Sequence, residues 1–165
     1  MKLAHLNGLR AFVAPGYASS SWHLENDHDL KFSWNEEAGR QGLNDALKLI
    51  DQAEAHPSGR LSGVLYPAQI DTCSEALLRD SMAAARERGR PLTTHIAQSV
   101  PEFLEMTRRH GVTPIQWAQD IGLLGPGTIP GHAILLDEHS GLHGPGRHDR
   151  NPPADRGRGV ENGRE

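Results

Sequence analysis

Two histidines within short apolar segments offer the clearest chemistry in this sequence. His95 lies within residues 91–97 (PLTTHIA) and His132 within residues 129–136 (IPGHAILL). Both segments are partly β-branched and follow turn-forming residues, which predicts two buried strands. On neighbouring strands of a β/α repeat, the two imidazoles can converge at one end of a sheet or barrel, where metal and catalytic sites are built. The alternative for each is a buried histidine that only satisfies its own hydrogen bonds.

The elements that must position these histidines are predicted by apolar periodicity and turn residues. Residues 9–14 form a candidate strand, and apolar residues at helical spacing predict a helix near residues 43–53. A second candidate strand covers residues 61–66 and is stopped by Pro67. Residues 17–34, between the first strand and the first helix, are polar and predict a loop.

The later helices carry capping signals. Thr72 and Glu75 have the spacing of a capping box that opens one helix, and Ser99 and Glu102 repeat this spacing for the next. Thr113 precedes a proline at the first position of a third helix. Strand starts are therefore about 30 to 40 residues apart, which suits parallel strands joined by helical crossovers.

Size and composition exclude several classes of protein. The chain has 165 residues, enough for one domain but fewer than the roughly 200 that a complete eight-stranded β/α barrel needs. The net charge is -4 and no basic stripe lies outside the C-terminal residues, so we expect no nucleic-acid partner. The single cysteine favours a reducing cytoplasm. No apolar run approaches the roughly 18 residues that span a membrane.

Residues 140–165 differ in composition from the rest of the chain, because they are rich in Gly, Pro, Arg and His. Such a segment has little apolar surface to offset its ordering entropy, which predicts a disordered tail. The abrupt change is also typical of a shifted reading frame in GC-rich coding sequence. An ordinary disordered tail is the alternative.

Several short motifs, in order, resemble one known family. They are THIAQS at residues 94–99, Glu102, GVTPIQ at 111–116, GLLGP at 122–126 and GHA at 131–133. Over roughly residues 60–139 their order and spacing resemble the middle of the amidohydrolase superfamily. The branch most similar to this sequence holds the cytosine and guanine deaminases and the triazine chlorohydrolases.

The resemblance implies a metal-dependent (β/α)8 barrel that hydrolyses C–N or C–Cl bonds of heterocycles. Because the chain is short, we expect an α/β fold that is an incomplete (β/α)8 TIM-type barrel, with about the middle strands and helices, over residues 1–139. The disordered tail then covers residues 140–165. An incomplete barrel leaves two sheet edges unpaired, so we expect poor solubility or a homo-oligomer that pairs these edges.

The resemblance also assigns roles to individual residues. By it, His95 is the metal ligand of the fifth barrel strand, and His132 is the sixth-strand histidine that contacts the metal or the bound water and substrate. The metal is a divalent cation, zinc or iron, which activates water for attack on an electron-poor carbon. Gln98 occupies the catalytic position where the deaminases place a proton-shuttling glutamate, and it cannot titrate. The family's first-strand His-x-His pair and eighth-strand aspartate are absent.

Two functions stay open at this point. The chain is either a fragment of a metal-dependent amidohydrolase for a small heterocyclic substrate, or a non-catalytic remnant or truncated open reading frame without a complete active site. With one expected metal ligand and one helper present, we expect the chain alone to be inactive.

Other side chains give weaker signals. Cys73, next to a helix start, suits either a thiol with a lowered pKa or a small buried residue. Asp71 suits either the barrel mouth or helix initiation, and Glu36 and Glu37 predict a solvated helix start. The last group, either a metal site or a solvated loop, consists of His23, Asp27, His28 and Asp29.

Overall fold

The computed structural model describes residues 8–26 and 29–136. Asp27, His28 and the predicted tail at residues 140–165 lie outside the described residues. Within these ranges, no helix is both long and apolar enough to cross a membrane.

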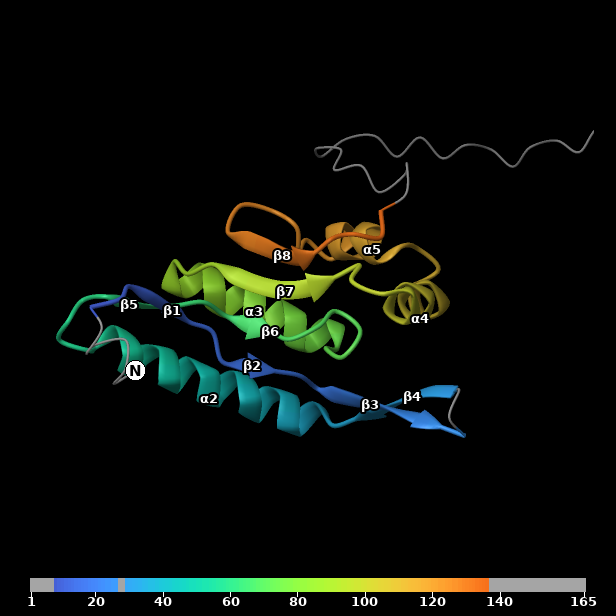
Figure 1. The fold of residues 1–165 in the computed structure, drawn as a ribbon, viewed down its shortest axis with the longest axis horizontal. Coiled ribbons are helices and arrows are strands. Elements are labelled where there is room, and N and C mark those ends of the chain that lie inside the picture. Colours follow the sequence, from blue (N-terminus) through green and yellow to red (C-terminus); the bar gives the residue numbers. More distant parts are fainter. Residues whose placement is uncertain (1–7, 27–28, 137–165) are drawn as a thin grey trace, which may run out of the picture.

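Parallel strand pairs form the centre of the molecule (Figure 1). The pairs are β1 (Ala11–Val13) with β5 (Leu61–Gly63), β2 (Gly16–Tyr17) with β6 (Tyr66–Pro67), and β7 (Leu92–Ile96) with β8 (Thr128–His132). Parallel bridges from Leu65 to Leu92 and from Gln69 to His95 join the β5–β6 segment to β7. The spatial order of these segments therefore follows their order in the chain, as sequential β/α units require.

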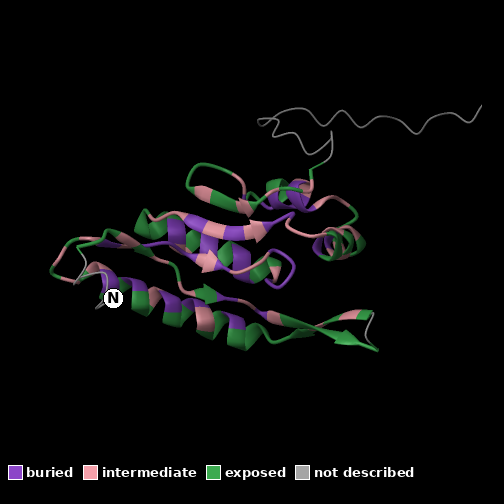
Figure 2. Ribbon diagram, in the orientation of Figure 1, coloured by how far each residue is buried: buried purple, intermediate pink, exposed green. Residues whose placement is uncertain are grey.

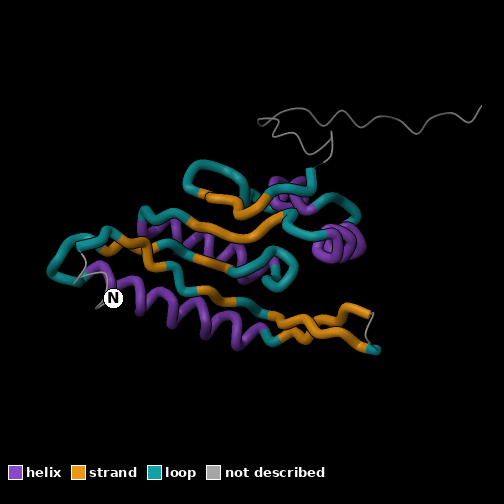
Figure 3. The backbone as a smooth tube through the Cα atoms, viewed as in Figure 1, coloured by secondary structure: helices purple, strands orange, loops and turns teal. Residues whose placement is uncertain are grey.

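Helices connect the successive parallel strands (Figure 3). They are α2 (Glu36–Glu54), α3 (Glu75–Arg88), α4 (Val100–His110) and α5 (Pro114–Asp120). The helix α2 contacts β2, β5 and α3, whereas α3 contacts β6 and β7. The mixed α/β fold with parallel strands and helical crossovers agrees with the prediction from element spacing.

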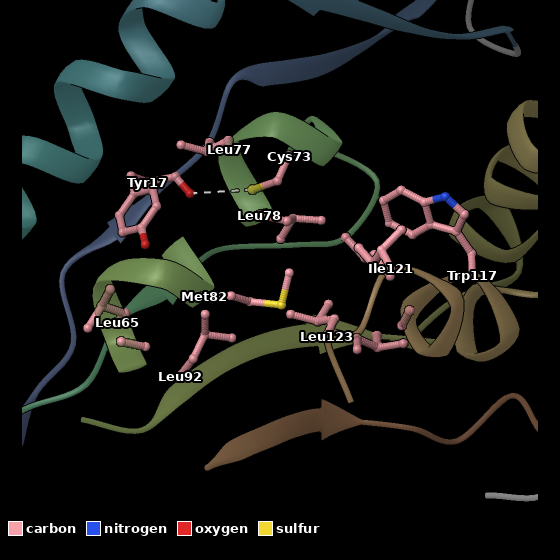
Figure 4. Close-up of a cluster of buried hydrophobic side chains, with 14 of the residues drawn as sticks. Tyr17, Leu65, Cys73, Leu77, Leu78, Met82, Leu92, Trp117, Ile121 and Leu123 are labelled. Atoms are coloured by element: carbon pink, nitrogen blue, oxygen red, sulfur yellow. Dashed lines mark hydrogen bonds between the residues drawn. The ribbon is translucent and has the colours of Figure 1, made fainter. Parts of the chain in front are cut away.

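The hydrophobic core lies between the strands and these helices (Figures 2 and 4). On β7, Leu92, Thr94 and Ile96 are buried, whereas Thr93 and His95 are only half-buried. The strand therefore has one buried face and one half-buried face. It follows that His95 lies on the face of the strand that does not pack into the main core.

The predicted polar loop at residues 17–34 is wrong, because most of it forms an antiparallel hairpin. Strand β3 (Ser20–Glu25) pairs with β4 (Asp29–Trp34). The register places Trp22 opposite Phe32 and Leu24 opposite Leu30. Such aromatic and aliphatic cross-strand pairs stabilise a hairpin even where the intervening residues are polar.

The first helix starts where Glu36 and Glu37 predict, whereas the second differs from the prediction. Helix α2 begins at Glu36, because the Asn35 side chain accepts a hydrogen bond from the Ala38 amide, and it continues through the apolar stripe at residues 43–53. Helix α3 is capped by Ser74, whose side chain accepts from the Leu77 amide. The Thr72 hydroxyl instead donates to the Gln69 carbonyl, so Thr72 is not the cap.

The caps of the two later helices follow the prediction more closely. The Ser99 side chain accepts from the Glu102 amide at the start of α4. At α5, Thr113 and Gln116 form both hydrogen bonds of a capping box. The Glu102 carboxylate does not return to the Ser99 amide, however, so the capping box predicted at α4 is incomplete.

We expect Leu78→Ala in α3 to lower the free energy of unfolding by about 2–5 kcal/mol, because Leu78 is fully buried and its removal leaves a cavity. Urea denaturation followed by circular dichroism measures this loss. The control is Leu104→Ala in α4, where the side chain is 62% exposed. Equal stability of the two variants would contradict the core described above.

Candidate active site

The structure brings His95 and His132 together. They lie at the carboxyl ends of β7 and β8, and their ring centroids are 4.6 Å apart with the ring planes tilted by 33°. The parallel register pairs His95 with Gly131 and Ile96 with His132, so the two histidines are offset by one residue along the strands. The carboxyl end of parallel strands is where β/α folds build their sites.

The strand that carries His132 covers only the first part of the apolar segment and is largely exposed, not buried as predicted. It spans Thr128–His132, so His132 is its last residue, and the apolar residues that follow belong to a loop. The amide of Ala133 donates to the carbonyl of Ile96 at 2.9 Å. The amides of Ile134 and Leu135 donate to the carbonyl of Ala97 at 3.2 and 3.0 Å. The loop after β8 is therefore tied to the turn that follows His95.

Backbone strain gathers at these two strand ends. Ala97, His132 and Ala133 have φ angles of 53°, 66° and 50°. This left-handed region costs a non-glycine residue on the order of 1 kcal/mol and persists only where the surrounding structure imposes it. Three of the four non-glycine residues with positive φ in the described chain lie here. Contacts with the surrounding structure, and not the local conformational preference, therefore hold this backbone.

The imidazole of His95 is packed closely. Its Nδ1 is buried and has no hydrogen-bond partner, and the Tyr66 ring lies edge-on with a centroid distance of 5.7 Å. A Cβ at position 131 would lie 2.9 Å from this Nδ1, so only glycine fits opposite His95. Burial, and to a smaller extent repulsion by His132, lower the pKa of His95. The ring is therefore neutral near pH 7, the form that binds metals.

The histidine pair offers two imidazole ligands for a metal ion. A buried ring nitrogen without a partner fits this use, because unsatisfied buried polar atoms are rare in proteins. Zinc sites in proteins hold three or four protein ligands. Within residues 8–26 and 29–136, no group of three or more histidine, cysteine, aspartate or glutamate side chains could hold a metal ion.

The structure does not join Gln98 to the histidine pair. The described contacts of Gln98 include no hydrogen bond to either imidazole, and Gln98 lines a separate pocket of about 550 Å³. Apolar side chains of the β3–β4 hairpin and the start of α4 form much of this pocket. The backbone amide of Gln98 donates to the Glu102 carboxylate at 2.9 Å.

Asp71 lines the same pocket. The sequence alone leaves its role open between the barrel mouth and helix initiation. Asp71 is 5% exposed, and its Oδ1 has no hydrogen-bond partner. Burial raises the pKa of this carboxyl, although the nearby Arg109 opposes the shift. The Arg109 guanidinium donates to the Asp71 carbonyl at 2.7 Å and lies over the rings of Phe32 and Trp34. Arg109 thus anchors the hairpin over the strand ends.

The remaining candidates are structural. Cys73 is buried and burial raises its pKa to about 11, so the hypothesis of an activated thiol is wrong. Glu36 and Glu37 form the first turn of α2, as predicted, and Glu36 accepts a hydrogen bond from Ser74. His23 and Asp29 lie exposed on the hairpin, in no metal-binding group within the described part of the chain.

We expect Gly131→Ala to displace the His95 ring, because the new methyl group would meet Nδ1. The loss in the free energy of unfolding should be about 1–3 kcal/mol, as for other overpacked sites. The nuclear Overhauser effect between the rings of His95 and His132 should weaken at the same time. Gly125→Ala is the matched control, since a Cβ there meets nothing within 4 Å. An unchanged ring contact in Gly131→Ala would contradict this geometry.

We also expect His95 to titrate below the ordinary histidine pKa of about 6.5 in the metal-free protein. Its contribution to stability is present above pH 6.5 and is lost as the pH falls, because the unfolded state then binds more protons. His132→Ala should raise the pKa of His95 only in part, since burial is the larger cause. NMR titration of the His95 ring measures both values. A His95 pKa above 6.5 would refute the described environment.

The comparisons with known proteins give relatives of one kind. No family model matches the chain. The chain is 30% identical over 126 residues to the 5'-deoxyadenosine deaminase of Methanosarcina mazei. The aligned residues make up 76% of this chain and 29% of that relative. The chain thus spans less than a third of the length of the curated relatives that it matches.

Solved structures give the same picture of the fold. An adenosine deaminase from Xanthomonas campestris with bound zinc superposes with a TM-score of 0.65 at 20% identity, covering 84% of this chain and 28% of that one. An atrazine chlorohydrolase from Arthrobacter aurescens in complex with zinc gives a TM-score of 0.64 at 18% identity, covering 82% and 29%. The relatives named as deaminases support placing the chain in the amidohydrolase superfamily, and the solved structures show the fold that it shares with these hydrolases.

Proposed function

We propose that this chain is a piece of a metal-dependent amidohydrolase that hydrolyses a C–N or C–Cl bond of a small heterocycle. The observation that carries the proposal is the histidine pair, with ring centroids 4.6 Å apart at the carboxyl ends of adjacent parallel strands. The relatives named as nucleoside deaminases and the zinc-bound neighbours support this class of reaction and a heterocyclic substrate.

The proposal includes an incomplete (β/α)8 barrel. The four parallel segments lie in chain order with helical crossovers, which is the arrangement of consecutive barrel units. The neighbours match over less than a third of their own chains. In this proposal residues 1–139 belong to the barrel, and residues 140–165 form the tail. Within the described residues β1 pairs only with β5 and β8 only with β7, so both could pair with further strands.

Each site residue then has a role. His95 is a ligand of a divalent cation, zinc or iron, and His132 is a second ligand or a contact to water and substrate. A bound cation of this kind supplies the charge that makes water a nucleophile near neutral pH. The neutral imidazole of His95 suits ligation, and Gly131 leaves room for it. Gln98 takes the catalytic position after His95, but it cannot carry a proton.

A second candidate function is a non-catalytic remnant. The histidines alone are fewer than the three or four ligands of a working site, and the described part of the chain offers no further group. Gln98 at the proton-shuttle position favours the same alternative. In this case the fold would persist while the reaction is lost.

Zinc binding by the full chain tests the site. After loading with zinc and dialysis, we expect His95→Ala to lose the bound metal, whereas His132→Ala retains part of it. His56→Ala is the control, because His56 lies in the turn after α2 and contacts Ser58. Elemental analysis gives the metal content. Equal zinc content of the wild type and of His95→Ala would show that His95 is not a metal ligand.

Activity of the chain alone should be absent or very low, because two ligands do not hold a metal in the geometry that activates water. The measurement is hydrolysis of an aminated purine nucleoside and of a chlorinated triazine by the zinc-loaded chain. Turnover that follows the monomer peak on a sizing column would contradict the proposed dependence on further ligands.

A further inference from the structure

One buried carboxylate has no place in the roles proposed above. Glu102, in the first turn of α4, is 1% exposed and among the most deeply buried polar residues of the described chain. A buried carboxylate is costly unless hydrogen bonds satisfy it. In the sequence Glu102 is explained as half of a capping box, yet its side chain does not bond to the Ser99 amide.

Glu102 instead holds the turn that follows His95. Its Oε1 accepts from the Ala97 amide at 2.7 Å, and its Oε2 accepts from the Gln98 amide at 2.9 Å. Both hydrogen bonds are charge-assisted when the carboxylate is ionised, and such bonds are stronger than those between neutral groups. They fix two successive peptides directly after the strand that carries His95.

The peptides fixed in this way also hold the strand end of His132. The Ala97 carbonyl accepts from the amides of Ile134 and Leu135, and the Ile96 carbonyl accepts from Ala133. Ala97 has a φ of 53°, which an alanine does not adopt without support. The Ala97 residue is therefore held on one side by Glu102 and on the other by the loop after His132.

We propose that Glu102 is a positioning residue, which sets the distance between His95 and His132 by clamping the Ala97–Gln98 turn. This proposal rests on the proposed function in one respect, namely that the histidine pair binds a metal. The clamp itself stands on the described hydrogen bonds. Loss of the clamp frees Ala97 to leave the left-handed region, which moves the end of β7 relative to the loop after β8.

The test compares two variants at the start of α4 in the full chain. Glu102→Gln keeps the size of the side chain, but its NH2 group faces a backbone donor. Ser99→Ala removes only the helix cap, which costs a comparable amount of helix stability without touching the Ala97 and Gln98 amides. Amide hydrogen exchange and the ring-to-ring nuclear Overhauser effect of the histidines are measured without metal, and zinc affinity is measured separately.

In Glu102→Gln we expect exchange at Ala97 and Gln98 to become about ten- to hundred-fold faster, and the contact between the two rings to be lost. Zinc should bind about ten- to hundred-fold more weakly, as for other residues that orient ligands. In Ser99→Ala these values should stay near those of the wild type, although the helix start frays. Equal effects of the two variants would overturn the proposal, because Glu102 would then only start the helix.

Two further outcomes keep the test decisive. If Glu102→Gln does not fold, Glu102→Asp replaces it, since the shorter carboxylate can reach only one amide. An unchanged ring contact in Glu102→Asp would overturn the clamp. If the wild type binds no zinc but the ring contact still depends on Glu102, positioning is supported and the proposed metal function alone is wrong.

Discussion

The parallel pairing of β7 with β8 is the constraint on which the rest of the site depends. Its register sets Leu92 opposite Thr128 at one end and Ile96 opposite His132 at the other. Because side chains alternate along a strand, this register also decides that His95 lies against the backbone of Gly131. A shift by one residue would set Pro130 or His132 opposite His95 in place of Gly131, and a side chain at that place would meet the His95 ring.

The crossover between these strands explains why the register is kept. The Thr128 hydroxyl donates to the Leu123 carbonyl at 2.7 Å, and the Leu92 amide donates to the Gly127 carbonyl at 2.9 Å. Both bonds tie the start of β8 to the end of the preceding crossover and to β7. Trp117 of α5 and Ile121, which caps the end of this helix, belong to the same core as Leu92 (Figure 4). These hydrogen bonds and core contacts thus fix the amino ends of β7 and β8. In the proposal above, the hydrogen bonds of Glu102 act at the carboxyl ends.

The parts of this arrangement that are encoded locally could be predicted from the sequence. The caps at Ser99 and Thr113 depend on residues within four positions, and the two faces of β7 depend on strict alternation. The polarity of the residues in the β3–β4 hairpin predicts a loop, whereas the alternation of Trp22 and Leu24 with polar residues indicates a strand. The use of Glu102 could not be predicted, since it depends on the left-handed backbone of Ala97, which tertiary contacts impose.

The outer strands of the sheet and the proposed metal site have the same requirement, which is additional β/α units. Phe12 on β1 is 72% exposed and Ile129 on β8 is 53% exposed, and these are the outermost parallel strands of the described chain. Apolar side chains on unpaired strand edges favour association with further strands. A metal site built on His95 and His132 likewise needs further ligands. Additional β/α units, from a longer chain or from a second copy, would cover the exposed side chains and bring ligands to the same end of the strands. In the proposed barrel, closure of the sheet would therefore both stabilise the fold and complete the set of ligands around the histidine pair.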